Sequence, residues 1–191
     1  MSPDLSGRIP YGHKKTNYIR MKTRLFIISL SLIWLMGTSC HKVEFDVKNP
    51  DVDQFVSILI SGNYFEKVGY DLPVFSDKDI ERLLFYLKDT TRLNEFPANP
   101  ISSKYTNPKI LCECLFWTID GIRFGTKYPS LEPCLIDTST YSDLTGYTRL
   151  SGKKLIVIST LYINWYNEYK KNPTETLKKK KLFENTPYKW N

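Results

Sequence analysis

A short apolar run near the N-terminus constrains this chain more than any other feature. A basic stretch begins at Met21, an uncharged apolar run extends from Leu25 to Met36, and small residues then lead to Cys40. This order is typical of a secretory signal peptide. The run of about a dozen residues is too short to cross a bilayer core, which needs roughly 20. A buried core helix is the alternative interpretation.

Cys40 closes this segment, and the small residues before it resemble a bacterial lipobox. In that signal the cysteine thiol is lipidated, and cleavage makes the cysteine the first mature residue. Gly37 departs from the pattern, because the consensus prefers Leu three residues before the cysteine. The alternative is ordinary cleavage near Ser39, which would leave Cys40 as a free or disulfide-bonded thiol. We expect residues 21–39 to be a lipoprotein signal peptide, and Cys40 to carry a lipid that holds the chain on a membrane.

The other boundaries follow from this segment. Residues 1–20 are polar and precede the signal peptide, so we interpret them as an over-extended start or a disordered stretch. Residues 40–48 are interpreted as a tether, in which Val43, Phe45 and Val47 alternate as in a short edge strand. Residues 49–191 remain as a single helical domain.

The net charge changes once the leader is removed. The whole chain carries +7, whereas residues 40–191 carry 21 basic and 19 acidic side chains, a net charge of +2. Residues 40–169 carry −3, and residues 170–191 carry +5. Nucleic-acid binding needs basic groups clustered on the folded face, which the body of the domain lacks. We therefore expect no nucleic acid among its partners.

Two helices are predicted in the first half of the domain from apolar residues at helical spacing. The first begins at Asn49-Pro50, with Asn as N-cap and Pro at the first helical position, and ends at Gly62. The second begins at Ser76, which forms a variant capping box with Asp79, and continues to Leu87.

Two longer helices and one short helix are predicted in the second half. The most apolar mature segment extends from Lys109 to Phe124 and is ended by Gly125. A long helix follows Ser151 as N-cap and ends at Asn172-Pro173, and Thr174 to Phe183 forms a short fifth helix.

Two stretches between these helices lack a periodic pattern. Residues 90–108, rich in Pro and Asn, are predicted to be a long loop, and residues 126–150, with two prolines and Gly146, to be irregular. The predicted fold class is therefore all-α, a small compact bundle of four to five helices with long irregular loops.

Histidine is nearly absent from the mature chain. His13 precedes the signal peptide, and His41 adjoins Cys40. No Ser-His or Cys-His catalytic pair and no His-based metal site can be built in the body of the domain. We therefore predict no catalytic residue, no metal and no cofactor.

Three cysteines remain in the domain. Cys112 and Cys114 lie two apart on the central helix, so they face different directions and do not pair with each other. Cys134 could pair with either of them in an oxidising compartment. Buried free thiols are the favoured alternative.

Carboxylates are the remaining catalytic option. Glu113 and Asp120 lie seven apart on one face of the central helix, with Trp117 between them and Arg123 three residues after Asp120. A carboxylate pair beside an aromatic side chain is typical of glycosidases. The favoured alternative is a solvated helix face that carries one local ion pair.

Two further features are candidates for contact with a partner. Trp165 and Tyr166 on the last long helix could line a binding surface, because such side chains anchor interfaces and stack on sugars, although a helical aromatic stripe usually faces the core. The lysine run 178–181 is either a solvated helix end or a contact with anionic lipid head groups.

Several motifs together resemble an uncharacterised family of Bacteroides-type lipoproteins. They are NPISS at 99–103, CECLFWTIDGIRFG at 112–125, YPSLEP at 128–133, the opening NPD at 49–51 and the closing YKW at 188–190. The resemblance covers nearly all of residues 45–191. It implies an envelope compartment and a helical domain, without an assigned activity. The residues after Cys40 lack the dense acidic run of many surface-exported lipoproteins in that group, so a periplasm-facing position is the alternative to surface exposure.

We therefore predict a lipid-anchored outer-membrane protein of the cell envelope, a non-enzymatic module that binds a protein or a glycan. The candidate binding surface comprises Glu113, Trp117, Asp120, Arg123, Trp165 and Tyr166, together with the loop 90–108. A carboxylate-dependent glycan hydrolase and a structural envelope accessory protein are the alternatives. A cleft that brings Glu113 or Asp120 together with aromatic side chains would favour the hydrolase.

Overall fold

The computed structural model describes residues 44–101, 108–143 and 146–191. The predicted signal peptide, Cys40 and the start of the tether lie outside these residues. Phe45–Asn191 form one compact unit. Within the described residues, no helix is both long enough and apolar enough to cross a membrane.

The first predicted helix is α2, Val52–Ser61. Its N-cap is Asp51 rather than Asn49, because the Asp51 carboxylate accepts a hydrogen bond of 2.7 Å from the backbone N–H of Gln54. Gly62 ends the helix as predicted, at φ +70°, where a side chain would be strained. The tether residues 44–48 form no strand.

The second predicted helix is shorter than its pattern indicates. Ser76 and Asp79 form the capping box at the 3₁₀ turn η1, Asp77–Asp79, and α4, Ile80–Phe85, follows directly. An additional helical turn, α3, occupies Tyr64–Lys67 between α2 and η1.

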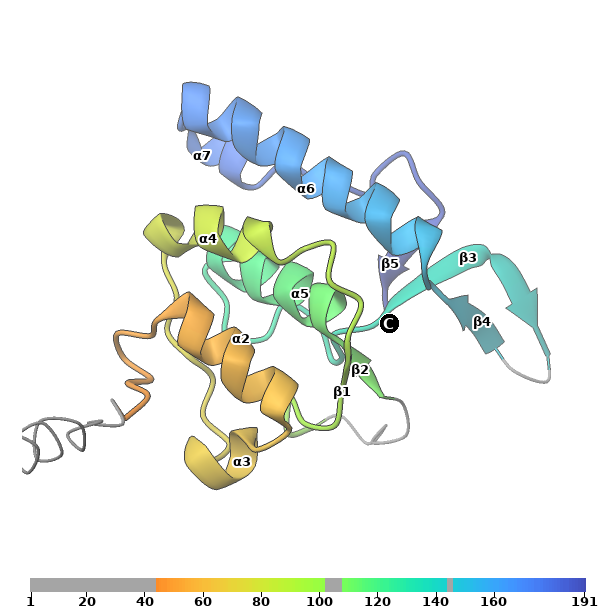
Figure 1. Cartoon of the computed structure of the whole chain (residues 1–191). Helices are drawn as coiled ribbons and strands as arrows, with labels where there is room; N and C mark the ends of the chain where they lie inside the picture. The colour runs from red at the N-terminus through yellow and green to blue at the C-terminus, as the bar shows by residue number, and fades with distance from the viewer. Residues whose placement is uncertain (1–43, 102–107, 144–145) are drawn as a thin grey trace, which may run out of the picture. The chain divides into compact units, whose positions relative to one another are not determined.

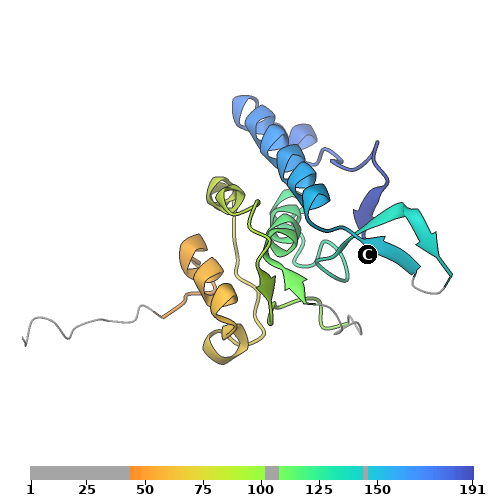
Figure 2. The ribbon, with the colours of Figure 1, turned by 45° about the vertical axis from the view of Figure 1, so that its right-hand side comes forward.

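The central helix is α5, Leu111–Phe124, which ends at Gly125 as predicted. The sequence of α5 is apolar on nearly every face, and ten of its side chains are buried. Accordingly α5 lies between α2 and α6 in both views of the ribbon (Figures 1 and 2). A helix buried all round is the expected centre of a small core.

The last long helix is α6, Lys153–Lys171, which buries Leu155, Ile158, Tyr162 and Trp165 against that core. Its N-cap is Gly152 instead of Ser151, and it ends at Asn172 as predicted. The fifth helix is a single turn, α7, Glu175–Lys178, capped by the Thr174 hydroxyl.

The all-α prediction is wrong, because the described residues also form two antiparallel sheets. β1, Arg92–Leu93, pairs with β2, Lys109–Ile110, and the loop predicted at 90–108 therefore begins in a strand. Residues 102–107 of that loop lie outside the described residues.

The larger sheet has the order β4-β3-β5. β3, Leu135–Ser142, and β4, Gly146–Arg149, occupy the stretch predicted to be irregular, and β5, Tyr188–Trp190, is the closing YKW motif. The β3–β4 hairpin extends away from the helices (Figure 1). β5 pairs Trp190 with Leu135, some fifty positions earlier. The residue pattern within either segment does not reveal a pairing between segments so far apart in the chain.

Candidate functional site

Glu113 is fully buried, in contrast to the solvated helix face favoured from the sequence. Its carboxylate accepts hydrogen bonds from the Leu135 backbone N–H at 3.0 Å and from the Arg149 guanidinium, whose Nε lies 3.1 Å away. Burial raises the pKa of Glu113, and Arg149 opposes that shift. The side chain therefore joins α5 to β3 and β4 and has no exposed surface at which a substrate could contact it.

Asp120 is also buried, and it belongs to a different cluster. It forms the predicted local ion pair with Arg123 at 2.5 Å and accepts a hydrogen bond of 2.9 Å from the Trp190 indole N–H. Burial raises the pKa of Asp120, whereas Arg123 lowers it. The ion pair is confirmed, but it lies in the interior instead of on a solvated face.

Arg123 connects this cluster to the C-terminal segment. Its guanidinium donates to the backbone carbonyls of Lys178 and Lys180, and its Cζ lies 4.3 Å from the centre of a Trp165 ring. Asp120, Arg123 and Trp165 therefore meet in space, and together they hold α7 and β5 against α5.

The predicted aromatic candidates are mainly parts of the core. Trp165 is 2% exposed, donates its indole N–H to the Leu177 carbonyl at 2.7 Å and stacks on Tyr169. Tyr166 is half-buried beside it. Because five of the six predicted surface residues are buried, they do not form an exposed binding surface.

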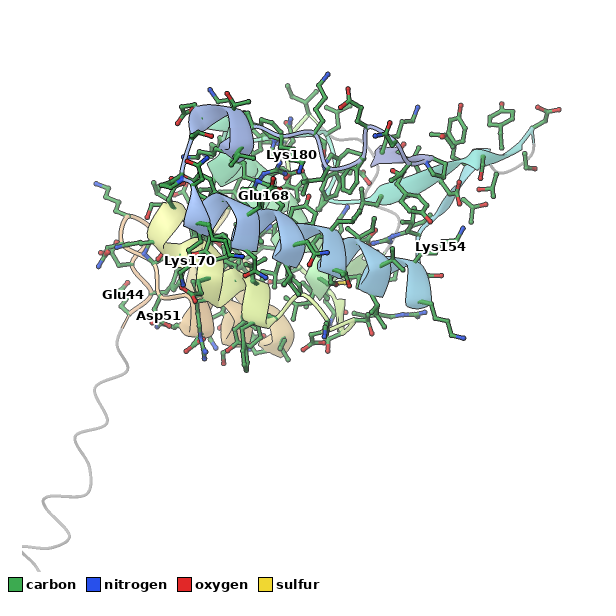
Figure 3. The ribbon with its side chains drawn as sticks, turned by 90° about the horizontal axis from the view of Figure 1, so that it is seen from above. Glu44, Asp51, Lys154, Glu168, Lys170 and Lys180 are labelled. Carbon is green, nitrogen blue, oxygen red and sulfur yellow. The ribbon has the colours of Figure 1, made fainter. Side chains whose placement is uncertain are left out.

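The lysine run is largely exposed at the end of α7, as the solvated interpretation predicts, and three of its members also form ion pairs. Lys178 contacts Asp77, Lys179 contacts Glu175, and Lys180 contacts Glu168 on α6, as Figure 3 shows for the last pair.

The three thiols of Cys112, Cys114 and Cys134 are buried and free, so the disulfide alternative is not observed. Over the described ranges, no group of His, Cys, Asp or Glu side chains could hold a metal ion.

The structure contains a cleft that these predictions missed. It has a volume of about 960 Å³ and is lined by the second half of α5, the connector of residues 71–78 and the start of the loop after α5. Trp117, Thr118, Gly121 and Ile122 form its α5 side, so Trp117 is the only residue of the predicted surface set that lines it. Neither Glu113 nor Asp120 is among the lining residues.

The connector is an apolar wall held by contacts on both sides. Leu72, Pro73, Val74 and Phe75 line the cleft. The Tyr64 hydroxyl donates to the Asp71 carbonyl at 2.6 Å, the Val74 N–H donates to the Val47 carbonyl at 2.8 Å, and Phe75 packs on Phe55 of α2. These contacts hold the connector against α3, Val47 and α2.

Gly121 lets the loop after α5 close one end of the cleft. The Thr126 N–H donates to the Gly121 carbonyl at 3.0 Å. A Cβ at Gly121 would lie 3.0 Å from the Thr126 carbonyl oxygen, closer than about nine in ten real Cβ contacts. The small residue therefore allows Thr126 and Lys127 to approach the helix and join the lining.

The rim of the cleft is basic. Its lining includes Lys48, Lys78, Lys127 and Lys178 but only two acidic side chains, Asp71 and Asp77. Asp77 is already bound to Lys178 at 2.8 Å and to the Tyr169 hydroxyl at 3.1 Å. Among the described residues, no carboxylate forms an ion pair with the other three lysines. The cleft thus combines an apolar wall with an excess of positive charge, four lysines against two aspartates.

Sequence reasoning could have found only part of this site. The apolar cluster LPVF at 72–75 is a visible signal, because four apolar residues in a connector between helices need a packing partner. The rim lysines come from positions as far apart as 48 and 178, and no local pattern links them.

Comparison with known proteins places the domain in a family. The model of a domain of unknown function (DUF4943) matches residues 46–191, nearly the whole compact unit. This agrees with the extent of the family resemblance found in the motifs. No curated protein and no solved structure matches the chain.

Proposed function

The chain belongs to the DUF4943 family, a domain of unknown function, and we propose that it is a non-enzymatic binding module of the cell envelope, anchored to a membrane through a lipid on Cys40. The binding site in this proposal is the cleft between α5 and the connector 71–78. The protein is proposed to be an outer-membrane lipoprotein of the Bacteroides type that faces either the periplasm or the cell surface.

The anchor is supported by the sequence of residues 21–40. A basic start, a short apolar run and small residues before a cysteine are the parts that lipid attachment requires. The lipid would supply the membrane attachment, because the apolar run is too short to span a bilayer.

One observation supports the binding role. The domain has an open apolar cleft, whereas its two candidate catalytic carboxylates are buried and already bound by other side chains. Ligand sites are usually concave, mostly apolar and bordered by a few polar groups, and the cleft has these properties. Glu113 and Asp120 are each bound by an arginine and a further N–H donor, and neither borders the cleft. The geometry therefore favours binding over carboxylate-dependent hydrolysis, and its apolar lining favours a small ligand over the protein or glycan predicted from the sequence.

Metabolic labelling with a fatty acid tests the anchor. We expect the wild-type chain to incorporate the label and Cys40→Ala to lose it. Cys134→Ala is the matched control, because it removes a buried thiol elsewhere and should leave labelling unchanged. Label that persists in Cys40→Ala would refute the anchor site.

Cleft occupancy can be tested with Nile red, a neutral apolar dye whose emission rises in apolar sites. Thr118→Phe would fill the cleft from α5, whereas Thr160→Phe is a matched control on α6. Both hydroxyls donate to the carbonyl four residues earlier, at 2.8 Å and 3.2 Å, so the two changes remove the same kind of hydrogen bond, and circular dichroism of both variants checks that each is folded. We expect Thr118→Phe alone to abolish saturable dye binding. Equal binding by the two variants would refute the cleft as the binding site.

A further inference from the structure

The residues that line the cleft indicate which kind of ligand it binds. This inference depends on the proposed binding function. The connector offers Leu72, Val74 and Phe75 on one side, and α5 offers Ile122 on the other, whereas Trp117 behind it is almost fully buried. An apolar group placed between them would remove apolar surface from water on both faces. The inner part of the cleft therefore suits an alkyl or aryl group.

The rim suits an anionic group. Lys48, Lys78 and Lys127 line the cleft without an ion-pair partner among the described residues, and all three side chains are exposed. Lys78 Nζ reaches only the neutral Asn49 amide oxygen at 3.5 Å, and the Lys127 ammonium lies 5.5 Å from the centre of the Tyr128 ring. The lining carries four lysines against two aspartates, and Asp77 is already paired with Lys178, so a ligand anion would complement the excess positive charge of the rim.

The concave shape selects a single molecule over a membrane surface. A cleft of about 960 Å³ lies within the range of small-molecule sites. Val74 is 65% exposed, whereas Leu72, Phe75 and Ile122 are only partly exposed, so a flat bilayer surface would contact the rim lysines and Val74 and cover less of the other three side chains. An amphipathic molecule that enters the cleft would therefore contact the apolar lining and the rim lysines together.

We propose that the cleft between α5 and the connector 71–78 binds a monomeric amphipathic anion, with its apolar part between Val74 and Ile122 and its carboxylate, phosphate or sulfate at Lys48 and Lys127. Recognition requires both parts: burial of the apolar group provides the attraction, and the lysines distinguish an acidic from a neutral or basic head group.

Two amphiphiles with the same tail test this ligand class. Dodecanoate and dodecyltrimethylammonium both carry a twelve-carbon tail and differ in the sign of the head group. Each is titrated by calorimetry, below its micellar concentration, into the full chain carrying Cys40→Ala, so that no attached acyl group adds apolar surface to the sample. We expect saturable binding of dodecanoate and at least about tenfold weaker binding of the cation.

Charge-reversal variants locate the head group. Lys48→Glu/Lys127→Glu should weaken dodecanoate binding by about tenfold and should remove the preference over the cation. Lys88→Glu/Lys153→Glu is the matched control, because these two lysines are also exposed and do not line the cleft. Far-ultraviolet circular dichroism of all variants establishes that each is folded.

The outcomes separate this inference from the proposed function. Equal affinities for the two amphiphiles, combined with loss of both in Thr118→Phe, would overturn the anion class while the cleft stayed a binding site. Absence of any binding, including that of Nile red, would overturn both. Sedimentation with phosphatidylglycerol vesicles that persists in Thr118→Phe but is lost in Lys48→Glu/Lys127→Glu would assign the lysines to a membrane surface and overturn the monomeric ligand.

Discussion

Arg123→Met should destabilise the domain strongly, because Arg123 links α5 to the α7 segment and lies over Trp165 of α6. Its side chain is 1% exposed, forms an ion pair with Asp120, and donates to two backbone carbonyls near α7. Removing one partner of a buried ion pair typically costs about 3–5 kcal/mol. We therefore expect a total loss of about 4 kcal/mol of unfolding free energy.

Thermal unfolding followed by circular dichroism measures this loss. A change of 1 kcal/mol shifts the melting temperature of a domain of about 150 residues by roughly 2–4 °C, so we expect Arg123→Met to melt about 10 °C below the wild type. Arg82→Met is the control. Arg82 makes a similar paired contact with Asp53 and also lies over aromatic rings, but both side chains are about half exposed, so the melting temperature should barely change.

The destabilisation of Arg123→Met should depend on pH in a defined direction. Burial raises the pKa of Asp120 and Arg123 opposes it, so removing Arg123 raises the pKa further. The folded variant then binds a proton more tightly than the unfolded chain does. Its stability relative to the wild type should therefore improve as the pH falls below neutrality, and worsen as the pH rises through the folded pKa of Asp120.

A double variant tests whether the unpaired charge is the cause. Asp120→Leu/Arg123→Met removes both charges, and it should be more stable at pH 7 than Arg123→Met alone. Equal melting temperatures for Arg123→Met and Arg82→Met, or a deficit that does not change with pH, would refute this account of the buried pair.

Three further predictions concern other parts of the domain. Lys154 and Ser139 lower the pKa of Asp137 to about 2, so Lys154→Met should move its titration, followed by NMR, up toward the ordinary value and reduce the pH dependence of stability below pH 4. Burial raises the thiol pKa of Cys112 to about 12 and of Cys134 to about 11, so both should react with a disulfide reagent at pH 8 only after denaturation, and rapid reaction of the native chain would contradict their burial. Gly125→Ala should cost about 1 kcal/mol in denaturant unfolding, because Gly125 has φ +62° although no atom crowds it; an unchanged midpoint would show that the end of α5 can adopt another conformation.

Helices were the predictable part of the fold because their signals are local. The α5 segment is apolar and is followed by Gly125, and α6 shows one buried stripe that ends before Pro173. Both helices lie where the pattern placed them. Small errors occur at helix starts, such as Gly152 instead of Ser151 at α6 and Asp51 instead of Asn49 at α2, because several neighbouring residues can cap a helix.

The sheet and the burial of the polar candidates were not predictable in the same way. Leu135 and Ile136 pair with Trp190 and Lys189 across some fifty positions. Glu113 and Asp120 share one face of a helix, as their spacing predicts, but the spacing does not state that β3, β4 and β5 cover that face.

The sequence by itself determined the signal-like leader, the family and the positions of the two long helices, because each depends on residues that lie close together along the chain. The tertiary structure alone decided which charges are buried and which are free. Glu113 and Asp120 are enclosed by strands from distant segments, whereas Lys48 and Lys127 meet at a cleft that exists only after the connector 71–78 has packed on α2. Burial and proximity depend on long-range contacts, and these are properties of the folded chain.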